Sequence, residues 1–393
     1  MKTKERMQFS HVGGLQGVAA TTLSLVLLAG CASPPPPKPD EAKVKRFAQE
    51  GYLTDNHYAF STIDASWESP KSSFDVALMV PNGPGPFPLV IYLPALGETR
   101  SAGDAWRKAW AQGGYAVLSI QPLAGDADAW SSEEARAGNF SDLARERYSG
   151  KVMAARIQAL RLALAELIRR HNRKEPPLDR INLSRSAVAG YDLGAYTAMV
   201  MAGESVDNTG TPAFPIPISA VIALSPYADF SGVALSERYR GIRGPVLSVT
   251  SDLDEDPLGL VTPPAMRKAP FKYMPAGDKY LLILLNVSHR TLAGGAINQD
   301  AFESRPPGET GRGRSHSFFG MGGGRHVESA DTGGFSVRGP QPSMTTQAMG
   351  QTAIQNFTTA FLDVYLKNDP VAREWLTKNA PLWIKGHGEF QKK

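Results

Sequence analysis

Short apolar runs alternate along this chain with amphipathic helical segments, and this alternation restricts the fold more than any other feature. An opening antiparallel strand pair is predicted over 58–66 and 73–80. Continuous apolar runs, typical of strands buried on both faces of a sheet, follow at 89–93, 115–120, 187–189, 220–224, 246–249 and 280–285. Helical patterns separate them at 104–112, 142–171 and 346–366. We therefore expect an α/β fold, with a mostly parallel central sheet and helices on both faces.

The N-terminus has the layout of a secretory signal. Three basic residues lie within the first six positions, and the apolar run Val18–Leu28 is short for a transmembrane helix. The run ends at Leu28-Ala29-Gly30-Cys31, which resembles the lipobox of bacterial lipoproteins. That resemblance implies a signal peptide over 1–30, cleaved before a cysteine that receives lipid. The alternative is an ordinary signal peptide in which Cys31 occurs by chance.

The residues after Cys31 predict a tether. Pro34–Pro39 contains five prolines, so residues 31–50 are expected to form an extended, Pro-rich tether for a folded domain over 51–393. Ala32-Ser33 follows the cysteine, and similarity to Gram-negative lipoproteins then favours the outer membrane over the inner membrane. We expect a lipid-anchored protein of the bacterial cell envelope, facing the periplasm or the surface.

Composition excludes several classes of protein. The 42 basic and 38 acidic residues give a formal net charge of +4, which is no electrostatic footprint for nucleic acid. A single cysteine excludes an intrachain disulfide and a Cys-based zinc site. Pro257 and Pro263 exclude an EF-hand around 252–256. We expect no metal and no cofactor, because no paired ligand spacing is formed by the remaining histidines, His57, His171, His316, His326 and His387.

Residues 293–344 interrupt the alternation. This Gly-rich insert contains Gly322-Gly323-Gly324, shows little periodicity and is far longer than an ordinary connection. It is interpreted as a disordered segment or a functional flap. Its arginines suggest a basic patch, but nearby acidic residues favour a solvated loop.

A turn with a glycine on each side of an aspartate follows the strand at 187–189. Gly190-Tyr191-Asp192-Leu193-Gly194 lies between an apolar strand and a helical segment, which is the context of a nucleophile elbow. Glycines two residues before and after Asp192 allow the tight turn that projects its side chain above the sheet. The N–H of Leu193 can then stabilise an oxyanion. Alternatively, Asp192 is an N-cap, a role that Asp favours.

Further polar segments follow other strands in the chain order of an α/β-hydrolase. Pro94-Ala95-Leu96-Gly97 follows the strand at 89–93, three aspartates at 252, 254 and 256 follow 246–249, and His289 follows 280–285. The order of elbow, acid and histidine is 192, 254 and 289. A solvated turn for the aspartates and an ordinary loop position for His289 are the alternatives.

The chain resembles secreted α/β-hydrolases of the dienelactone hydrolase and platelet-activating-factor acetylhydrolase type. The similarity covers most of 75–380 and is carried by the stretches around 245–260, 263–270, 275–289 and 358–366. It implies Asp254 as triad acid, His289 as base and Asp192 at the nucleophile position, with an oxyanion hole formed by the amides of Leu96 and Leu193. Asp254 is preferred over Asp252 and Asp256 because it belongs to a Thr-Gly-x-x-Asp-like stretch beginning at Thr250.

Three departures from that family affect the chemistry. Asp192 replaces a serine or cysteine, Pro94 replaces a histidine, and Glu98 stands where a second glycine is usual. A carboxylate that attacks an ester carbonyl gives a mixed anhydride. Attack on a saturated carbon, as in haloalkane dehalogenases and epoxide hydrolases, gives an alkyl ester that water activated by His289 could hydrolyse. Those enzymes usually carry Trp after the aspartate, whereas this chain has Leu193.

Three functions stay open from the sequence. The first is a hydrolase of a small ester, lactone or alkyl substrate that uses Asp192 as nucleophile. In the second, Asp192 is a base acting on water, and in the third the fold is a catalytically silent scaffold that binds a ligand or partner. Repulsion between Asp192 and Glu98 would raise a pKa, which suits a general acid or a binding site better than a nucleophile. Ser225 is a weak substitute nucleophile because it lacks elbow glycines.

Overall fold

A computed structural model describes residues 38–54, 57–69, 72–206, 213–228, 232–255, 264–297 and 342–393. The predicted signal peptide and Cys31 lie outside the described residues. Most of the predicted Gly-rich insert, 298–341, also lies outside them.

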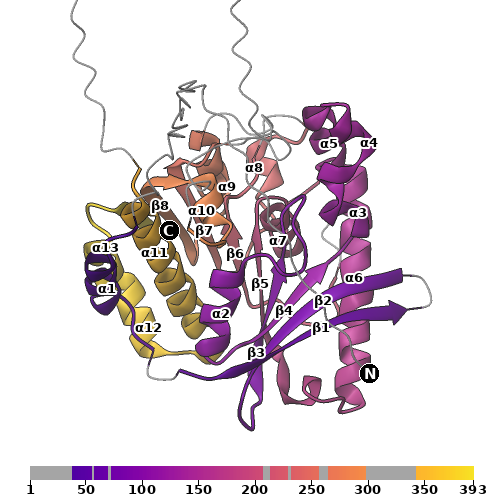
Figure 1. Ribbon diagram of the computed structural model, residues 1–393, viewed down its shortest axis with the longest axis horizontal. Helices are drawn as coiled ribbons and strands as arrows, with labels where there is room; N and C mark the ends of the chain where they lie inside the picture. The colour runs from indigo at the N-terminus through magenta and orange to yellow at the C-terminus, as the bar shows by residue number, and fades with distance from the viewer. Residues whose placement is uncertain are drawn as a thin grey trace, which may run out of the picture. The chain divides into compact units, whose positions relative to one another are not determined.

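One nine-stranded sheet runs through the described domain in the order β1-β2-β4-β3-β5-β6-β7-β8-β9 (Figure 1). The pairs from β4 through β3 and β5 to β8 are parallel, whereas β1/β2, β2/β4 and β8/β9 are antiparallel. The strands are β1 (Phe60–Ser69), β2 (Ser72–Pro81), β3 (Phe87–Leu93), β4 (Ala116–Gln121), β5 (Ile181–Tyr191), β6 (Ala220–Leu224), β7 (Val246–Leu253), β8 (Lys279–Ser288) and β9 (Gly388–Lys392). The predicted fold class, an α/β-hydrolase arrangement with a mostly parallel sheet, is confirmed.

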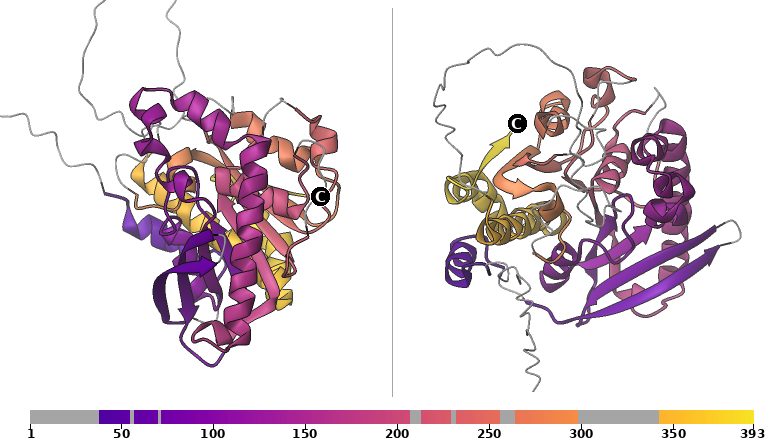
Figure 2. Two further views of the ribbon diagram at one scale, coloured as in Figure 1. Left: turned by 90° about the vertical axis from the view of Figure 1, so that its right-hand side faces the viewer. Right: turned by 45° about the horizontal axis from the view of Figure 1, so that its top comes forward.

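Helices cover both faces of this sheet (Figure 2). One face packs against α6 (Gly150–Asn172) and α7 (Leu193–Ala202), and the other packs against α2 (Asp104–Gln112) and α11 (Met344–Leu362). The shorter α-helices are α1 (Glu41–Gln49), α3 (Ala124–Ala127), α4 (Glu133–Arg136), α5 (Phe140–Arg147), α8 (Leu235–Arg238), α9 (Ala269–Tyr273), α10 (His289–Leu292), α12 (Pro370–Glu374) and α13 (Ala380–Trp383). The 3-10 and π turns are η1 (Ala129–Ser131), η2 (Leu178–Arg180), η3 (Pro264–Lys268), η5 (Asp363–Lys367) and η6 (Trp375–Asn379).

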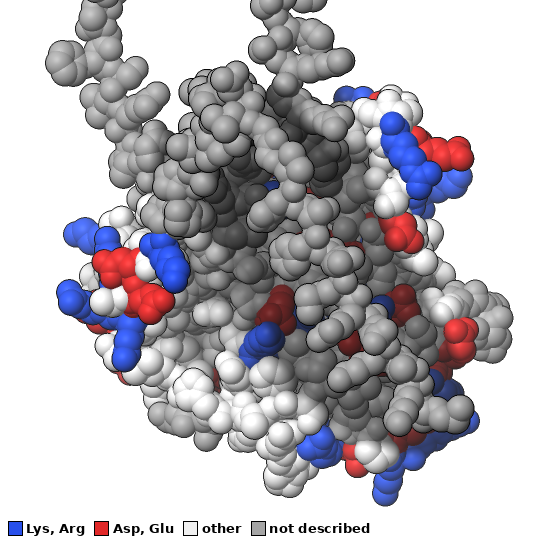
Figure 3. Space-filling model, viewed as in Figure 1, with Lys and Arg blue, Asp and Glu red and all other residues white. Residues whose placement is uncertain are grey.

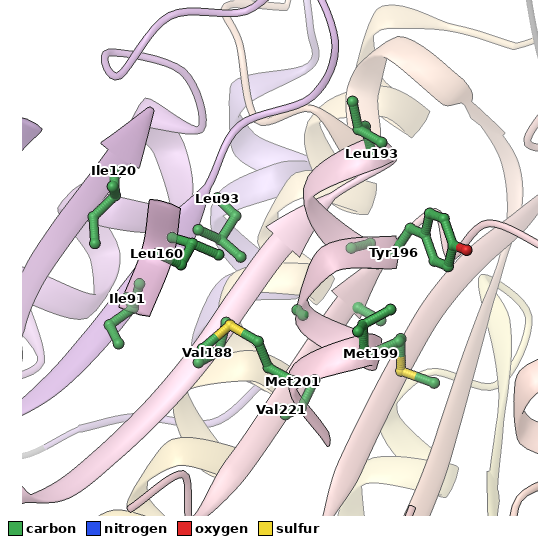
Figure 4. Close-up of a cluster of buried hydrophobic side chains, with 14 of the residues drawn as sticks. Ile91, Leu93, Ile120, Leu160, Val188, Leu193, Tyr196, Met199, Met201 and Val221 are labelled. Atoms are coloured by element: carbon green, nitrogen blue, oxygen red, sulfur yellow. The ribbon is translucent and has the colours of Figure 1, made fainter. Parts of the chain in front are cut away.

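Strand β3 shows why the central strands appear as continuous apolar runs. Successive side chains of a strand point to opposite faces of the sheet. Ile91 and Leu93 therefore join one core cluster with Leu160 of α6, while Val90 joins a second cluster with Trp110 of α2. Figure 4 shows part of the first cluster around β3, β5 and α7. Because both faces of β3 are buried, apolar residues occupy both sets of alternating positions in this strand.

The single helix predicted over 142–171 is wrong, because the chain forms two helices there, α5 and α6. The break falls at Tyr148 and Ser149. Ser149 is the N-cap of α6, and its Oγ accepts a hydrogen bond from the N–H of Val152 at 3.4 Å. A cap of this kind ends one helix and begins another even where the apolar stripe continues. The break also directs Tyr148 toward the end of β5.

Two terminal elements differ from the sequence prediction. Strand β9 adds an antiparallel edge to β8, and helix α1 forms inside the segment predicted as an extended tether over 31–50. Phe47 of α1 is buried and stacks on Trp383, with ring centroids 4.4 Å apart. Folded structure is thus present from α1 onward, ahead of the predicted domain boundary at residue 51. None of the helices in the described ranges combines the length and apolarity needed to cross a bilayer.

Candidate active site

The turn between β5 and α7 has the backbone of a nucleophile elbow. Asp192 stands between the two elements with φ 50° and ψ −108°, a left-handed conformation that is uncommon outside glycine. A Cβ added at Gly190 would lie 2.3 Å from the backbone of Gly194, and one at Gly194 would lie 1.9 Å from the carbonyl oxygen of Leu93. Glycine is thus required at both positions, as the sequence predicts. A strained backbone at a non-glycine residue is typical of functional sites.

The side chain of Asp192 points into the site and does not cap the helix. It makes no capping hydrogen bond with α7, so the N-cap alternative is wrong. Tyr148 Oη donates to Asp192 Oδ2 at 2.8 Å, and Arg267 Nη1 lies 3.5 Å from Asp192 Oδ1. The side chain of Asp192 is 12% exposed. Tyr148 and Arg267 therefore both orient this carboxylate, and a small part of it stays exposed.

Asp254 and His289 meet at the carboxyl ends of β7 and β8. Asp254 Oδ1 lies 2.7 Å from His289 Nδ1, and Asp254 is fully buried. Thr250 Oγ1 donates to the other carboxylate oxygen at 2.7 Å. Burial alone would raise the pKa of Asp254, but Arg267, then His289 and Thr250, outweigh burial and hold that pKa below its ordinary value. Because the acid engages Nδ1, Nε2 is the ring nitrogen that can serve a substrate.

The structure distinguishes the Asp254–His289 pair from the neighbouring candidates. Asp252 is exposed, and its Oδ1 accepts the N–H of Asn286 at 2.7 Å, while Asp256 lies outside the described residues. Ser225 is buried, donates to Asp254 Oδ1 at 2.8 Å and lies 3.1 Å from His289 Nδ1. Ser225 thus supports the acid side of the imidazole and is not aligned with Nε2 as a nucleophile would be.

The turn after β3 lies directly against the elbow, because Gly194 closely approaches the carbonyls of Leu93 and Pro94. Its amide at Leu96 and the amide of Leu193, at the start of α7, are the predicted oxyanion donors. Glu98 belongs to the same turn and is half-buried, and its Oε2 accepts the N–H of Ala95 at 3.0 Å.

The pKa of Glu98 depends on burial and on the other ionisable groups of the site. The pKa of Glu98 is raised to about 7, chiefly by burial, and the hydrogen bond from Ala95 opposes this rise. The negative charge of Asp192 contributes to the rise, whereas His289 acts against it. The repulsion expected from the sequence between the carboxylates of Asp192 and Glu98 is therefore present.

Arg267 is the residue that sequence reasoning missed. It lies in η3, is fully buried, and places Nε 3.3 Å from Asp254 Oδ1 and Nη1 3.5 Å from Asp192 Oδ1. It also donates to the carbonyl oxygens of Ser225 at 3.1 Å and of Asp254 at 3.2 Å. One guanidinium fork thus serves two carboxylates. Nothing in the sequence distinguishes Arg267 from Lys268 beside it.

No family model matches the chain, and no curated protein matches it in sequence. Among solved structures, the chain is similar to a dienelactone hydrolase from Anabaena variabilis, with 19% identity and a TM-score of 0.40. The match covers 62% of this chain and 91% of that chain. The strand order and connections of this chain define the fold class stated above. Within the described ranges, no cluster of His, Cys, Asp and Glu is arranged to hold a metal ion.

Proposed function

We propose that the protein is a hydrolase acting on a small ester, lactone or related electrophile, with Asp192 as nucleophile, His289 as base and Asp254 as the orienting acid. The observation that carries the proposal is the 2.7 Å Asp254–His289 hydrogen bond, formed at the same sheet edge as the strained elbow. An imidazole fixed in this way can activate water.

The state of Asp192 favours attack on carbon over proton abstraction. Arg267 and the hydroxyl of Tyr148 compensate the negative charge of Asp192, which argues against a role in deprotonating water. A carboxylate oxygen of Asp192 would instead form a bond to a saturated carbon of the substrate and release the leaving group. Water activated by His289 would then attack the resulting ester at Asp192, where the amides of Leu96 and Leu193 are the proposed oxyanion donors.

A single-turnover reaction in ¹⁸O-labelled water tests the covalent route. The expected result is one ¹⁸O atom in the peptide that contains Asp192, measured by mass spectrometry, after hydrolysis of an active ester, lactone, epoxide or haloalkane. His289→Gln should trap the alkyl ester on Asp192, whereas His387→Gln, in the turn before β9, is the matched control. Turnover of an epoxide or haloalkane without label in Asp192 would exclude a covalent role for this residue.

A second candidate is a ligand-binding scaffold without turnover. It is favoured by the contacts of Tyr148 and Arg267, which engage both oxygens of Asp192. The scaffold predicts that a ligand raises the melting temperature of the wild-type protein, and that no ester, lactone, epoxide or haloalkane is consumed. The hydrolase predicts consumption that is lost in His289→Gln.

We also propose that lipid on Cys31 holds the domain in the bacterial cell envelope, at the outer membrane. The lipobox-like sequence before Cys31 supports this proposal. On the face shown in Figure 3, the described residues carry positive and negative side chains side by side, so this face offers anionic lipid little electrostatic attraction. Metabolic labelling with an alkyne fatty acid should mark the wild-type protein in the membrane fraction, and Cys31→Ser should abolish both the label and the membrane association.

A further inference from the structure

We propose that Glu98 is the general acid of this site, and that the substrate class is an epoxide, whose oxygen leaves a saturated carbon and needs a proton. This inference rests on the proposed function. It gives the turn after β3 a second role: besides the amide of Leu96, it would supply the carboxylic acid that protonates the leaving oxygen.

The packing of the backbone fixes where Glu98 lies. Gly194 approaches the carbonyl oxygens of Leu93 and Pro94 so closely that the turn after β3 and the elbow form one contiguous unit. On its other side, the turn contacts Trp130, because a Cβ at Gly97 would lie 1.6 Å from Trp130 Nε1. Glu98 follows Gly97 directly, and its Oε2 accepts the N–H of Ala95 at 3.0 Å, so its carboxyl is held against the turn that packs on the elbow.

The distribution of charge distinguishes Glu98 from the two aspartates. The guanidinium of Arg267 lies within 3.5 Å of both Asp192 and Asp254. Among the ion pairs of the described residues, none involves Glu98, whose carboxyl accepts the backbone N–H of Ala95. A half-buried carboxyl without a cation, close to another carboxylate, retains its proton more readily than the paired ones.

Four titratable groups face Glu98 from the surrounding elements. They are Tyr92 on β3, Tyr191 on β5, Asp192 at the elbow and His289 on α10. Burial raises the pKa of both tyrosines well above the ordinary value, and Glu98 raises each further, so they stay neutral. With a pKa of about 7, Glu98 is poised to exchange a proton at neutral pH.

The proposed steps balance. Asp192 forms a bond to an epoxide carbon, the C–O bond breaks, and its electron pair stays on the oxygen, which takes the proton of Glu98. His289 then removes a proton from water as the oxygen of water bonds to the carboxyl carbon of Asp192. The ester breaks, the departing alkoxide takes the proton from His289, and the proton left on Asp192 returns to Glu98. The sum is epoxide plus water to diol.

Two substrates that share a 4-nitrophenyl group and a benzylic carbon but differ in leaving group test this role. We compare 4-nitrostyrene oxide, whose alkoxide needs a proton, with 4-nitrobenzyl bromide, whose bromide does not. Glu98→Gln should lower kcat/KM for the epoxide by about 100-fold or more, and for the bromide by less than about 3-fold. The wild-type rate on the epoxide should fall as pH rises through about 7, and Glu98→Gln should lose this limb.

The controls separate this inference from the proposed function. Glu98→Asp keeps a carboxyl in the turn and should recover part of the epoxide activity, while the exposed Glu374→Gln on α12 should leave both rates unchanged. Equal losses on both substrates, or no loss on the epoxide, would overturn the role of Glu98. Wild-type turnover of the bromide alone would preserve the hydrolase and overturn the substrate class. Turnover of neither substrate, nor of any ester or lactone, would overturn both.

Discussion

Arg267 is a buried cation that contacts both Asp192 and Asp254. Replacing it with methionine keeps much of the side-chain volume but removes the guanidinium from both carboxylates. Breaking a buried pair from one side is costly, so Arg267→Met should lower the free energy of unfolding by about 3–5 kcal/mol, measured by urea denaturation at neutral pH. The exposed Arg240→Met should change it by less than about 0.5 kcal/mol.

A double-mutant cycle measures how much of that loss in the free energy of unfolding comes from the pairing of Arg267 with Asp192. If Arg267 compensates the charge at the elbow, Asp192→Asn should reduce the cost of Arg267→Met by about 1 kcal/mol or more. Additive effects of the two substitutions would show that Arg267 serves only Asp254.

The raised pKa of Glu98 predicts a pH dependence of stability. Its pKa in the folded protein is about 7, against an ordinary value of 4.5. The folded state therefore binds this proton more tightly, so the contribution is fully present below about pH 4.5 and is lost as pH rises through 7. Between those limits the wild-type protein should lose about 2 kcal/mol relative to Glu98→Gln, allowing for partial exposure. Parallel stability curves, from urea titrations across this range, would contradict the prediction.

The predictable site residues are those that follow a strand directly. Asp192, Asp254 and His289 could be placed by sequence because the carboxyl ends of parallel strands share one edge. Tyr148 and Arg267 could not, because each reaches the site from a helical turn whose position depends on tertiary packing. Their catalytic roles, like those of the three predicted residues, stay predictions until turnover is measured.

The elbow is the element most sensitive to an added methyl group. Gly194→Ala would place a Cβ 1.9 Å from the carbonyl oxygen of Leu93 in the adjacent strand, with backbone on both sides. Because neither backbone can yield cheaply, we expect a loss of at least about 3 kcal/mol, or failure to fold, measured by thermal unfolding monitored by circular dichroism. Gly244→Ala, where a Cβ meets nothing within 4 Å, is the matched control. An unchanged melting temperature for Gly194→Ala would contradict the close packing of strand and elbow.

The strands and helices that could be predicted are those whose apolar periodicity lies within the element itself. Helix α2 has the predicted bounds, 104–112, and β6 the predicted bounds, 220–224. The α5–α6 break was missed because an apolar stripe carries no information about a cap within it. Strand β9 was missed because its five residues are half-exposed and stabilised by pairing with β8 far away in sequence.

At the scale of the whole molecule, α1 is part of the fold. Phe47 lies 6% exposed between Trp383 and His387, so Phe47→Ala should cost about 3 kcal/mol in the free energy of unfolding. Lys45→Ala, on the exposed side of the same helix, should cost less than about 0.5 kcal/mol. Equal effects in chemical denaturation would mean that α1 is only loosely attached.

The folding of α1 also limits the reach of the segment between Cys31 and the domain. If Cys31 carries the lipid, the chain free to extend runs from Cys31 to Asp40, the N-cap of α1, and spans at most about 30 Å at roughly 3.3–3.6 Å per residue. The twenty-residue tether expected from sequence would have allowed about 70 Å. With lipid on Cys31, the described domain would thus be attached within about 30 Å of the bilayer. If the domain is also the proposed hydrolase, substrates that partition into or leave the membrane would be encountered at a higher effective concentration than those in the surrounding fluid.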